Sequence, residues 1–106
     1  MTMITITFYA SAIRVSGHAF FAEYNQDIVC AGVSAIVFGG INYFSPEAVK
    51  VIKDSQNSTI FFELLEVDSK NLIAIDLIKT QLSVIASVYD QHIKIIDETN
   101  RIVIGK

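Results

Sequence analysis

The sequence predicts an α+β fold, a two-layer sandwich of a mainly antiparallel sheet with two helices in the order β β α β β α β. Apolar and polar residues alternate in several short segments, which is typical of strands, and apolar residues recur every three or four positions in one long segment, which is typical of a helix. The two strands of each predicted pair are separated by a short connection. This favours hairpins over a βαβ rhythm, and hence an antiparallel sheet.

Residues 4–8 and 13–16 form the first predicted strand pair. Isoleucine and phenylalanine alternate with threonine in the first segment, and Ile13 and Val15 alternate with polar residues in the second. The connection YASA contains no Asn-Gly or glycine-rich turn, so the sequence does not predict the form of the hairpin tip. Gly17 then releases the chain from strand geometry.

A helix is expected to begin after Asp27, because an aspartate side chain accepts hydrogen bonds from the amides of a first helical turn. It ends at Phe38 or continues to Phe44, since the two glycines after Phe38 each cost about 1 kcal/mol in a helix interior. The Ser-Pro pair at 45–46 closes it in either case. The predicted buried face is rich in small residues that allow close approach to the sheet: Ile28, Ala31, Ala35 and Phe38, with Gly32 and Gly39 beside them.

The second half repeats the pattern of two strands and a helix. A strand starts at Val49, a polar turn covers 54–58, and the partner strand covers 59–67. Both faces of that partner are largely apolar, which predicts cover on both sides or one face used by a partner subunit.

A second helix begins at a cap on Asp68 or Ser69, and its period is the clearest in the chain. A last strand covers 92–97, and a further extended piece is expected at 101–104. The apolar face of the helix consists of Leu72, Ile75, Ile78, Leu82, Ile85 and Tyr89.

Composition excludes several classes of protein. A chain of 106 residues forms one domain, residues 1–106, large enough to bury roughly 65% of its unfolded surface. A net charge of -3 without a basic stripe argues against nucleic-acid binding. The N-terminus lacks the basic leader of a secretory signal, and a single cysteine agrees with a reducing compartment, so we expect a cytoplasmic protein.

The charge-free segment 28–46 raises the question of a membrane span. About 18 apolar residues are enough for one, and a mean hydropathy of +0.48 is high. Glycines interrupt the segment, however, and no cluster of Lys or Arg flanks it. We expect a core helix and no membrane, with a buried subunit interface as the other explanation for the high hydropathy.

Cys30 and His18 form the candidate catalytic pair. Cys30 falls in the first turn of the predicted helix, where the backbone N–H groups and the positive end of the helix dipole stabilise a thiolate. The same N–H groups suit an oxyanion. If the loop between them turns back, His18 is the base that keeps Cys30 ionised and the acid that protonates a leaving amine.

Spacing alone leaves two other interpretations open. Cys30 can be a buried small hydrophobe in a core helix, with His18 an ordinary loop residue, because free cysteine is among the most buried residue types. A zinc site would draw its ligands from three dispersed segments, without CxxC or HxxxH spacing. We therefore expect no metal and no cofactor; the residues that such a site would use are His18, Asp27, Cys30 and His92.

The segment 17–36 resembles the signature of the Prp family, the ribosomal-processing cysteine proteases. It contains GHA, a loop of seven residues, DIVC and AGVSAI. The resemblance implies that His18 and Cys30 are the catalytic pair, with Asp27 in a supporting part. It also implies a homodimeric endopeptidase that removes a short N-terminal extension from large-subunit ribosomal protein twenty-seven, cutting after an aromatic pair.

Two positions before the helix depart from the family pattern. Asn25 and Gln26 stand where members commonly have Gly-Lys; asparagine tolerates a left-handed backbone, whereas the positive charge is lost. The carboxylate of Asp27 would raise the pKa of the Cys30 thiol. Capping is therefore its expected duty, and orientation of His18 is the competing one.

The candidate substrate contacts are Gly17, Ala19, Phe20, Phe21 and Ser34. The two phenylalanines are more often core anchors, yet a loop released by a glycine can close over an aromatic substrate. Ser34 lies one helical turn after the cysteine and faces the same side. The competing function is a non-catalytic ribosome-associated binding module with the same fold, which would bind substrate peptide without the cysteine.

Overall fold

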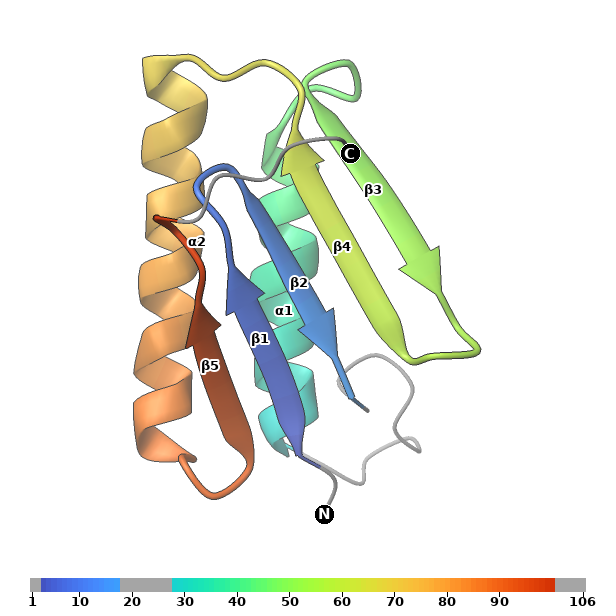
Figure 1. Cartoon of the computed structure of the whole chain (residues 1–106), viewed down its shortest axis with the longest axis vertical. Coiled ribbons are helices and arrows are strands. Elements are labelled where there is room, and N and C mark those ends of the chain that lie inside the picture. Colours follow the sequence, from blue (N-terminus) through green and yellow to red (C-terminus); the bar gives the residue numbers. More distant parts are fainter. Residues whose placement is uncertain (1–2, 18–27, 101–106) are drawn as a thin grey trace.

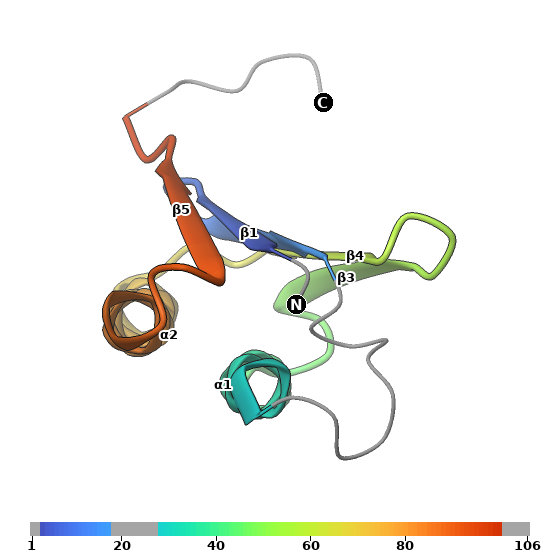
Figure 2. The same cartoon turned by 90° about the horizontal axis from the view of Figure 1, so that it is seen from below.

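The computed structural model describes residues 3–17 and 28–100 and has the predicted element order. Both helices cover the same face of one five-stranded sheet, whose strand order is β3-β4-β2-β1-β5 (Figures 1 and 2). The two-layer α+β prediction is confirmed. The elements are β1 (Ile4–Phe8), β2 (Ala12–Ser16), α1 (Ile28–Tyr43), β3 (Val49–Asp54), β4 (Thr59–Leu64), α2 (Ser69–Val88) and β5 (Ile93–Asp97).

Three of the four strand pairings are antiparallel, as expected from the hairpins. β5 is the exception, because it joins β1 in parallel with Ile4 opposite Ile93. Helix α2 carries the chain back along the sheet before β5 begins, which is the kind of connection that a parallel neighbour requires (Figure 1). At the tip of the first hairpin, the Tyr9 N–H donates to the Ala12 carbonyl at 2.9 Å.

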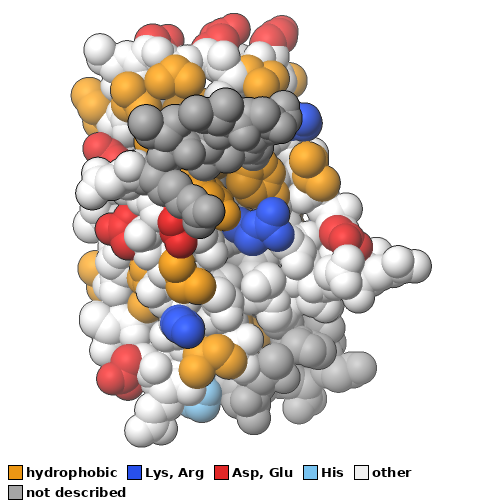
Figure 3. Space-filling view, in the orientation of Figure 1, with side chains coloured by type: hydrophobic (Ala, Val, Ile, Leu, Met, Phe, Trp, Pro, Cys, Tyr) orange, Lys and Arg blue, Asp and Glu red, His pale blue; other side chains and the backbone are white. Residues whose placement is uncertain are grey.

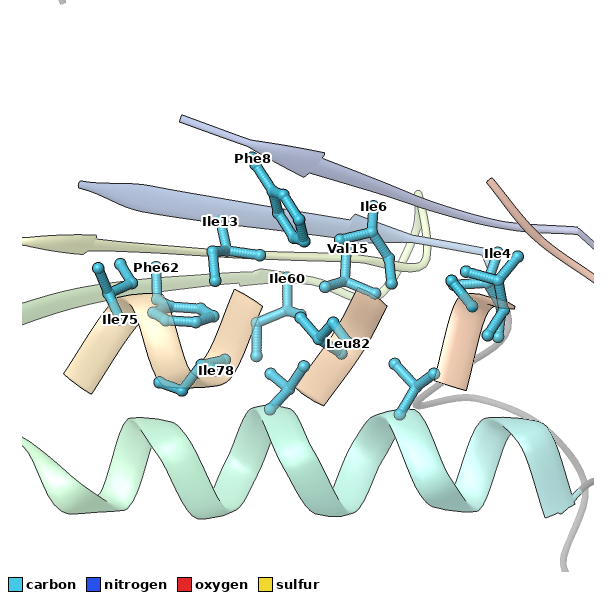
Figure 4. Close-up of a cluster of buried hydrophobic side chains, with 14 of the residues drawn as sticks. Ile4, Ile6, Phe8, Ile13, Val15, Ile60, Phe62, Ile75, Ile78 and Leu82 are labelled. Carbon is cyan, nitrogen blue, oxygen red and sulfur yellow. The ribbon is translucent and has the colours of Figure 1, made fainter. Parts of the chain in front are cut away.

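The core lies between the sheet and the helices (Figure 4). Alternate strand residues point toward the helices and are excluded from water. Each large side chain buried in this way contributes about 1.5–3 kcal/mol. The most completely buried strand residues are Ile4, Ile6, Ile13, Val15, Ile60 and Phe62.

Strand β4 is an inner strand that ends at Leu64, three residues before the predicted end at Val67. The Leu65 N–H still donates to the Ala48 carbonyl at 2.7 Å, and the Glu66 N–H donates to the same carbonyl at 3.3 Å, so the regular pairing with β3 ends here. On the face that the helices do not cover, the half-buried Phe61 ring packs edge-on against Tyr9, with ring centroids 6.2 Å apart.

The predicted buried face of α1 is wrong except at Phe38, which is half-buried and packs against the core. The helix buries Val29, Cys30, Val33 and Val37, whereas Ile28 is 73% exposed and Ala31 and Ala35 are also exposed. The helix is apolar around its whole circumference, so periodicity cannot single out one stripe. β-branched residues form the face that packs on the sheet. The helix continues through both glycines to Tyr43.

The small residues of α1 instead allow close approach to α2. A Cβ atom on Gly32 would lie 2.5 Å from Ile85 Cδ1, and one on Gly40 would lie 2.5 Å from Ile78 Cδ1 and 2.8 Å from its Cγ1. Both isoleucines therefore fill space that any side chain at these two positions would occupy. The glycines set the spacing of the two helices.

Helix α2 follows its prediction closely. Asp68 is the N-cap, and its carboxylate accepts from the Asn71 N–H at 2.8 Å. The helix buries Ile75, Ile78 and Leu82 as expected. Asn71 is buried too, which the apolar pattern did not predict; its side-chain amide donates to the Glu66 carbonyl at 2.9 Å. The extended piece expected at 101–104 lies outside the described residues.

Two neighbouring glycines test the contact between the helices. Gly39→Ala should raise the free energy of unfolding by up to about 1 kcal/mol, because alanine is the better helix former and nothing lies within 4 Å of its new Cβ. Gly40→Ala should lower it by about 1 kcal/mol, because overpacking against the buried Ile78 costs about 1–3 kcal/mol. Urea denaturation at one protein concentration measures both. Equal effects from the two variants would contradict the packing described here.

Candidate active site

The first turn of α1 lies at the end of the molecule where β2 finishes and β1 begins (Figure 1). Two backbone contacts tie this end together. The Gly17 N–H donates to the Ser58 carbonyl at 3.0 Å, and the Ile4 N–H donates to the His92 carbonyl at 2.8 Å. The end of β2, the starts of β1 and β5, and the β3–β4 turn therefore form one connected framework.

Cys30 is the third residue of α1, as predicted, and only 4% of its surface is exposed. It belongs to the cluster of buried residues that includes Val29 and Val33. The helix directs its first-turn N–H groups and the positive end of its dipole toward this region, which favours negative charge. A thiol here is positioned by the packing of the helix and is shielded from bulk water.

Gly17 ends β2 in a backbone conformation that only glycine adopts readily, with φ of 116°. Space is limited as well, because a Cβ atom would lie 2.7 Å from the Met3 carbonyl oxygen and 3.0 Å from Ile4 Cα. The sequence predicted that a glycine is needed where the chain leaves β2. The structure shows why: the chain turns here in contact with the start of β1, where a side chain would not fit.

The β3–β4 turn that holds Gly17 is itself fixed by Asp54. Its carboxylate accepts from the Asn57 side chain at 2.6 Å and from the backbone N–H groups of Gln56 and Asn57 at 3.1 and 3.2 Å. These hydrogen bonds, led by that from the Asn57 side chain, hold the pKa of the Asp54 carboxyl below its ordinary value. The predicted polar turn therefore holds Gly17, the residue before the candidate base. The sequence did not indicate this contact between the turn and the end of β2.

The structure describes some of the predicted site residues. Ser34 is half-buried on α1, one turn after Cys30. His92 is half-buried just before β5 and contributes its backbone carbonyl to the framework. The other predicted site residues lie outside the described ranges: His18, Ala19, Phe20, Phe21 and Asp27, together with Asn25 and Gln26.

The described residues contain no cluster of side chains that could hold a metal ion. Within 3–17 and 28–100, no group of three or more His, Cys, Asp or Glu side chains is arranged to hold a metal ion. Two of the residues named for the zinc alternative, His18 and Asp27, lie outside the described ranges.

Comparison with known proteins supplies the class. The sequence model of the family described as cysteine protease Prp matches residues 3–94. The ribosomal processing cysteine protease Prp of Mycoplasma genitalium is 35% identical over 97 residues, which cover 92% of this chain and 98% of that protein. The match thus extends far beyond the segment 17–36.

Solved structures agree with the fold. The essential ribosomal processing protease Prp from S. aureus, in complex with a covalently linked product peptide, superposes with a TM-score of 0.73 at 24% identity, covering 92% of this chain and 99% of that one. The same protease in complex with a substrate peptide gives a TM-score of 0.67 at 26% identity with the same coverage.

The α+β sandwich, the thiol at the start of α1 and these relatives define a cysteine protease. More specifically, the chain belongs to the Prp family, whose relatives found here are ribosomal processing cysteine proteases. The resemblance based on the residues of 17–36 is confirmed at the level of the family.

Gly17→Ala tests the framework beside the thiol. We expect a loss of about 1–3 kcal/mol in the free energy of unfolding, the usual cost of a residue held in a sparsely populated backbone region, increased by the contact with Met3. Ser16→Ala is the control, because it changes a half-buried neighbour without changing the backbone requirement. Thermal and urea denaturation compare the two. A loss no larger than that of Ser16→Ala would mean that the turn does not need glycine.

Proposed function

We propose that this protease removes the short N-terminal extension of large-subunit ribosomal protein twenty-seven by cutting after a pair of aromatic residues. The observation that carries the proposal is the position of Cys30 in the first turn of α1, inside the part of the chain that matches the Prp family. The S. aureus relative, which shares the fold, was solved with a covalently linked product peptide. Peptide cleavage through a covalent intermediate is the corresponding reaction for this chain.

Cys30 is the proposed nucleophile. Its thiolate attacks the scissile carbonyl carbon, a C–S bond forms, and the displaced electron pair moves to the carbonyl oxygen. First-turn N–H groups of α1 stabilise that oxyanion, because the helix N-terminus directs donors and positive potential at it. Collapse of the intermediate breaks the C–N bond and leaves the N-terminal fragment attached to sulfur as a thioester.

His18 is the proposed general base and acid. It takes the thiol proton, gives a proton to the departing amine, and then deprotonates the water that hydrolyses the thioester and regenerates the thiolate. Gly17 supports this role, since it fixes the direction in which the chain leaves β2 immediately before His18.

Asp27 has capping as its proposed main duty, because α1 begins at the next residue and a carboxylate at an N-cap accepts from first-turn amides. Ala19, Phe20 and Phe21 are the proposed contacts for the aromatic pair of the substrate. Ser34 is the proposed contact from the helix side.

The partner and the compartment complete the proposal. The substrate is a ribosomal protein precursor, the enzyme acts as a homodimer, and the reaction takes place in the cytoplasm. Neither a metal nor another cofactor takes part. The coloured part of the sheet face in Figure 3 has its basic side chains separated from one another, which does not favour binding to a nucleic-acid backbone.

Cleavage of a short peptide tests the reaction. A peptide with Phe-Phe before a small residue should be cut after the second phenylalanine, and the same peptide with Ala-Ala should remain intact, as followed by mass spectrometry. Cys30→Ala should abolish cleavage, and His18→Ala should reduce kcat/KM about 10²–10⁴-fold, the usual contribution of a general acid–base group.

The matched control is His92→Ala, which removes the other histidine and keeps the backbone carbonyl that accepts from the Ile4 N–H. It should retain nearly full activity. Cleavage by Cys30→Ala at the wild-type rate, or equal losses in the two histidine variants, would overturn the proposed pair.

The pH profile of Cys30 alkylation separates a catalytic thiol from a structural one. With 4% exposure the absolute rate will be low, so the midpoint of the profile is the informative quantity. We expect a midpoint clearly below about 8.5, the ordinary thiol value, which moves upward in His18→Ala. Asp27→Asn keeps a capping oxygen and should leave kcat nearly unchanged, whereas the loss of its negative charge should move the midpoint slightly downward. A wild-type midpoint at the ordinary value indicates a non-catalytic thiol, as in a binding module.

A further inference from the structure

Helix α2 carries a second apolar face that nothing in the described chain covers. Ile73, Leu77, Val84 and Val88 are 69%, 59%, 59% and 65% exposed. At 3.6 residues per turn these positions fall within an arc of about 60° on the side opposite the buried Ile75, Ile78 and Leu82. Figure 2 shows α2 at a corner of the molecule, with the sheet and α1 on two sides and the remaining sides open.

This exposed face makes α2 apolar on two opposite sides. Among the described helices, α2 alone is long and apolar enough to cross a membrane. Only 28% of its most apolar stretch is buried within the protein. A helix with apolar stripes on two opposite sides normally has both of them covered, either by protein or by a bilayer. Something should therefore cover the outer face, and the pattern of residues on it distinguishes the candidates.

A groove of about 790 Å³ runs beside this face, between the two helices. It is an apolar channel with Lys70 and Gln81 among its few polar groups. Gly39 leaves part of it open, because nothing lies within 4 Å of where its Cβ would be. Residues of both helices line the groove, among them Ala35, Gly39 and Tyr43 of α1, and Ile73, Leu77 and Ile78 of α2.

We propose that a second copy of this chain covers the face, with the two α2 helices packed antiparallel about a two-fold axis between Thr80 and Gln81. This rests on the homodimer of the proposed function and assigns its surface. Leu77 and Val84 lie three and a half positions on either side of that midpoint, and Ile73 and Val88 lie seven and a half. Each apolar residue therefore meets an apolar residue of the second copy, as a self-complementary interface requires.

The polar residues at the edge of the stripe obey the same symmetry. Lys70 and Asp90 are exposed at nearly equal distances from the midpoint, so the antiparallel arrangement brings each lysine near the aspartate of the second copy. Lys70 already lies over the Tyr43 ring at 5.6 Å, at the border of the groove. Gln81 sits at the axis, where its amide can pair with its symmetry mate. Thr80 lies equally close to the axis, and polar residues in an apolar helix seam set register in this way.

A lipid surface is the less suitable occupant. Helices that lie on membranes carry many Lys and Arg residues beside the apolar face, whereas α2 has only Lys70 and Lys79. Lys79 points toward the body of the protein, where its ammonium donates to the Tyr9 carbonyl at 2.5 Å. The net charge of -3 opposes attraction to anionic lipid as well.

Sedimentation velocity over a range of concentrations tests the surface. Wild type should be a dimer, and Leu77→Glu should raise the dimer dissociation constant about 100-fold, because the charge enters the seam twice, at about tenfold or more for each copy. Leu65→Glu is the matched control, since Leu65 is 56% exposed on the connection after β4 and is not part of the outer apolar stripe of α2. Leu65→Glu should leave the dissociation constant of the dimer unchanged. Both variants should still unfold cooperatively on heating, which shows that each chain remains folded.

Charge reversal tests the antiparallel arrangement separately. Lys70→Glu and Asp90→Lys should each weaken the dimer, and the two changes together in one chain should restore it. A parallel pair of α2 helices would show no such rescue. Likewise, Gln81→Cys in a Cys30→Ala background should cross-link two chains on mild oxidation, whereas Ser83→Cys, on the flank of the helix, should not.

Each alternative has its own signature. A wild-type chain that stays monomeric at every concentration overturns the homodimer and its surface, while the cleavage tests of Cys30 and His18 stand unaffected. A dimer that survives Leu77→Glu overturns the surface alone. Flotation with phosphatidylglycerol vesicles that is lost in Leu77→Glu, without dimerisation in solution, would assign the face to a membrane.

Discussion

The structure depends on one helix that packs on two neighbours at once. Valines of α1, at 29, 33 and 37, face the sheet, and its glycines at 32 and 40 receive the isoleucines of α2. By helical spacing Gly40 falls on the edge of the valine face and Gly32 lies beside it, so the contacts with the sheet and with α2 together fix the rotation of α1. The orientation of Cys30 is thereby fixed by packing, before any substrate binds. In the proposed mechanism, a nucleophile placed in this way needs little reorganisation to meet a carbonyl.

The end of β2 imposes a second constraint, which concerns direction. Gly17 must turn without a side chain because the start of β1 lies against it, and the β3–β4 turn holds its N–H. The chain ahead of α1 therefore leaves the sheet from a fixed point. In the proposed mechanism this point immediately precedes the general base.

The strands and α2 could be predicted because their patterns are unambiguous. A period of two in residues 4–8 and a repeat of three and four along α2 each match one structure only, and both were right. The buried face of α1 was wrong because a helix with apolar residues on all sides gives no periodic signal. The parallel pairing of β5 with β1 depends on how α2 returns the chain, which is a property of the whole fold. Of the site, the motif gave Cys30 its place on the helix, while the contacts of Gly17 involve segments that are far apart in sequence.

Helix α2 links the proposed interface to the proposed site. Its inner face inserts Ile78 and Ile85 into the spaces left by the glycines of α1, and its outer face is the one assigned to a second copy. Because the interior is closely packed, pressure on the outer face of α2 is transmitted to α1 rather than absorbed. Dimerisation would then restrict the same helix that positions the thiol, although the groove and Cys30 lie on different parts of α1. This also explains why α2 can remain apolar on both sides: the inner side sets the spacing of the helices, and the outer side is the part of the surface that a symmetric partner would remove from water.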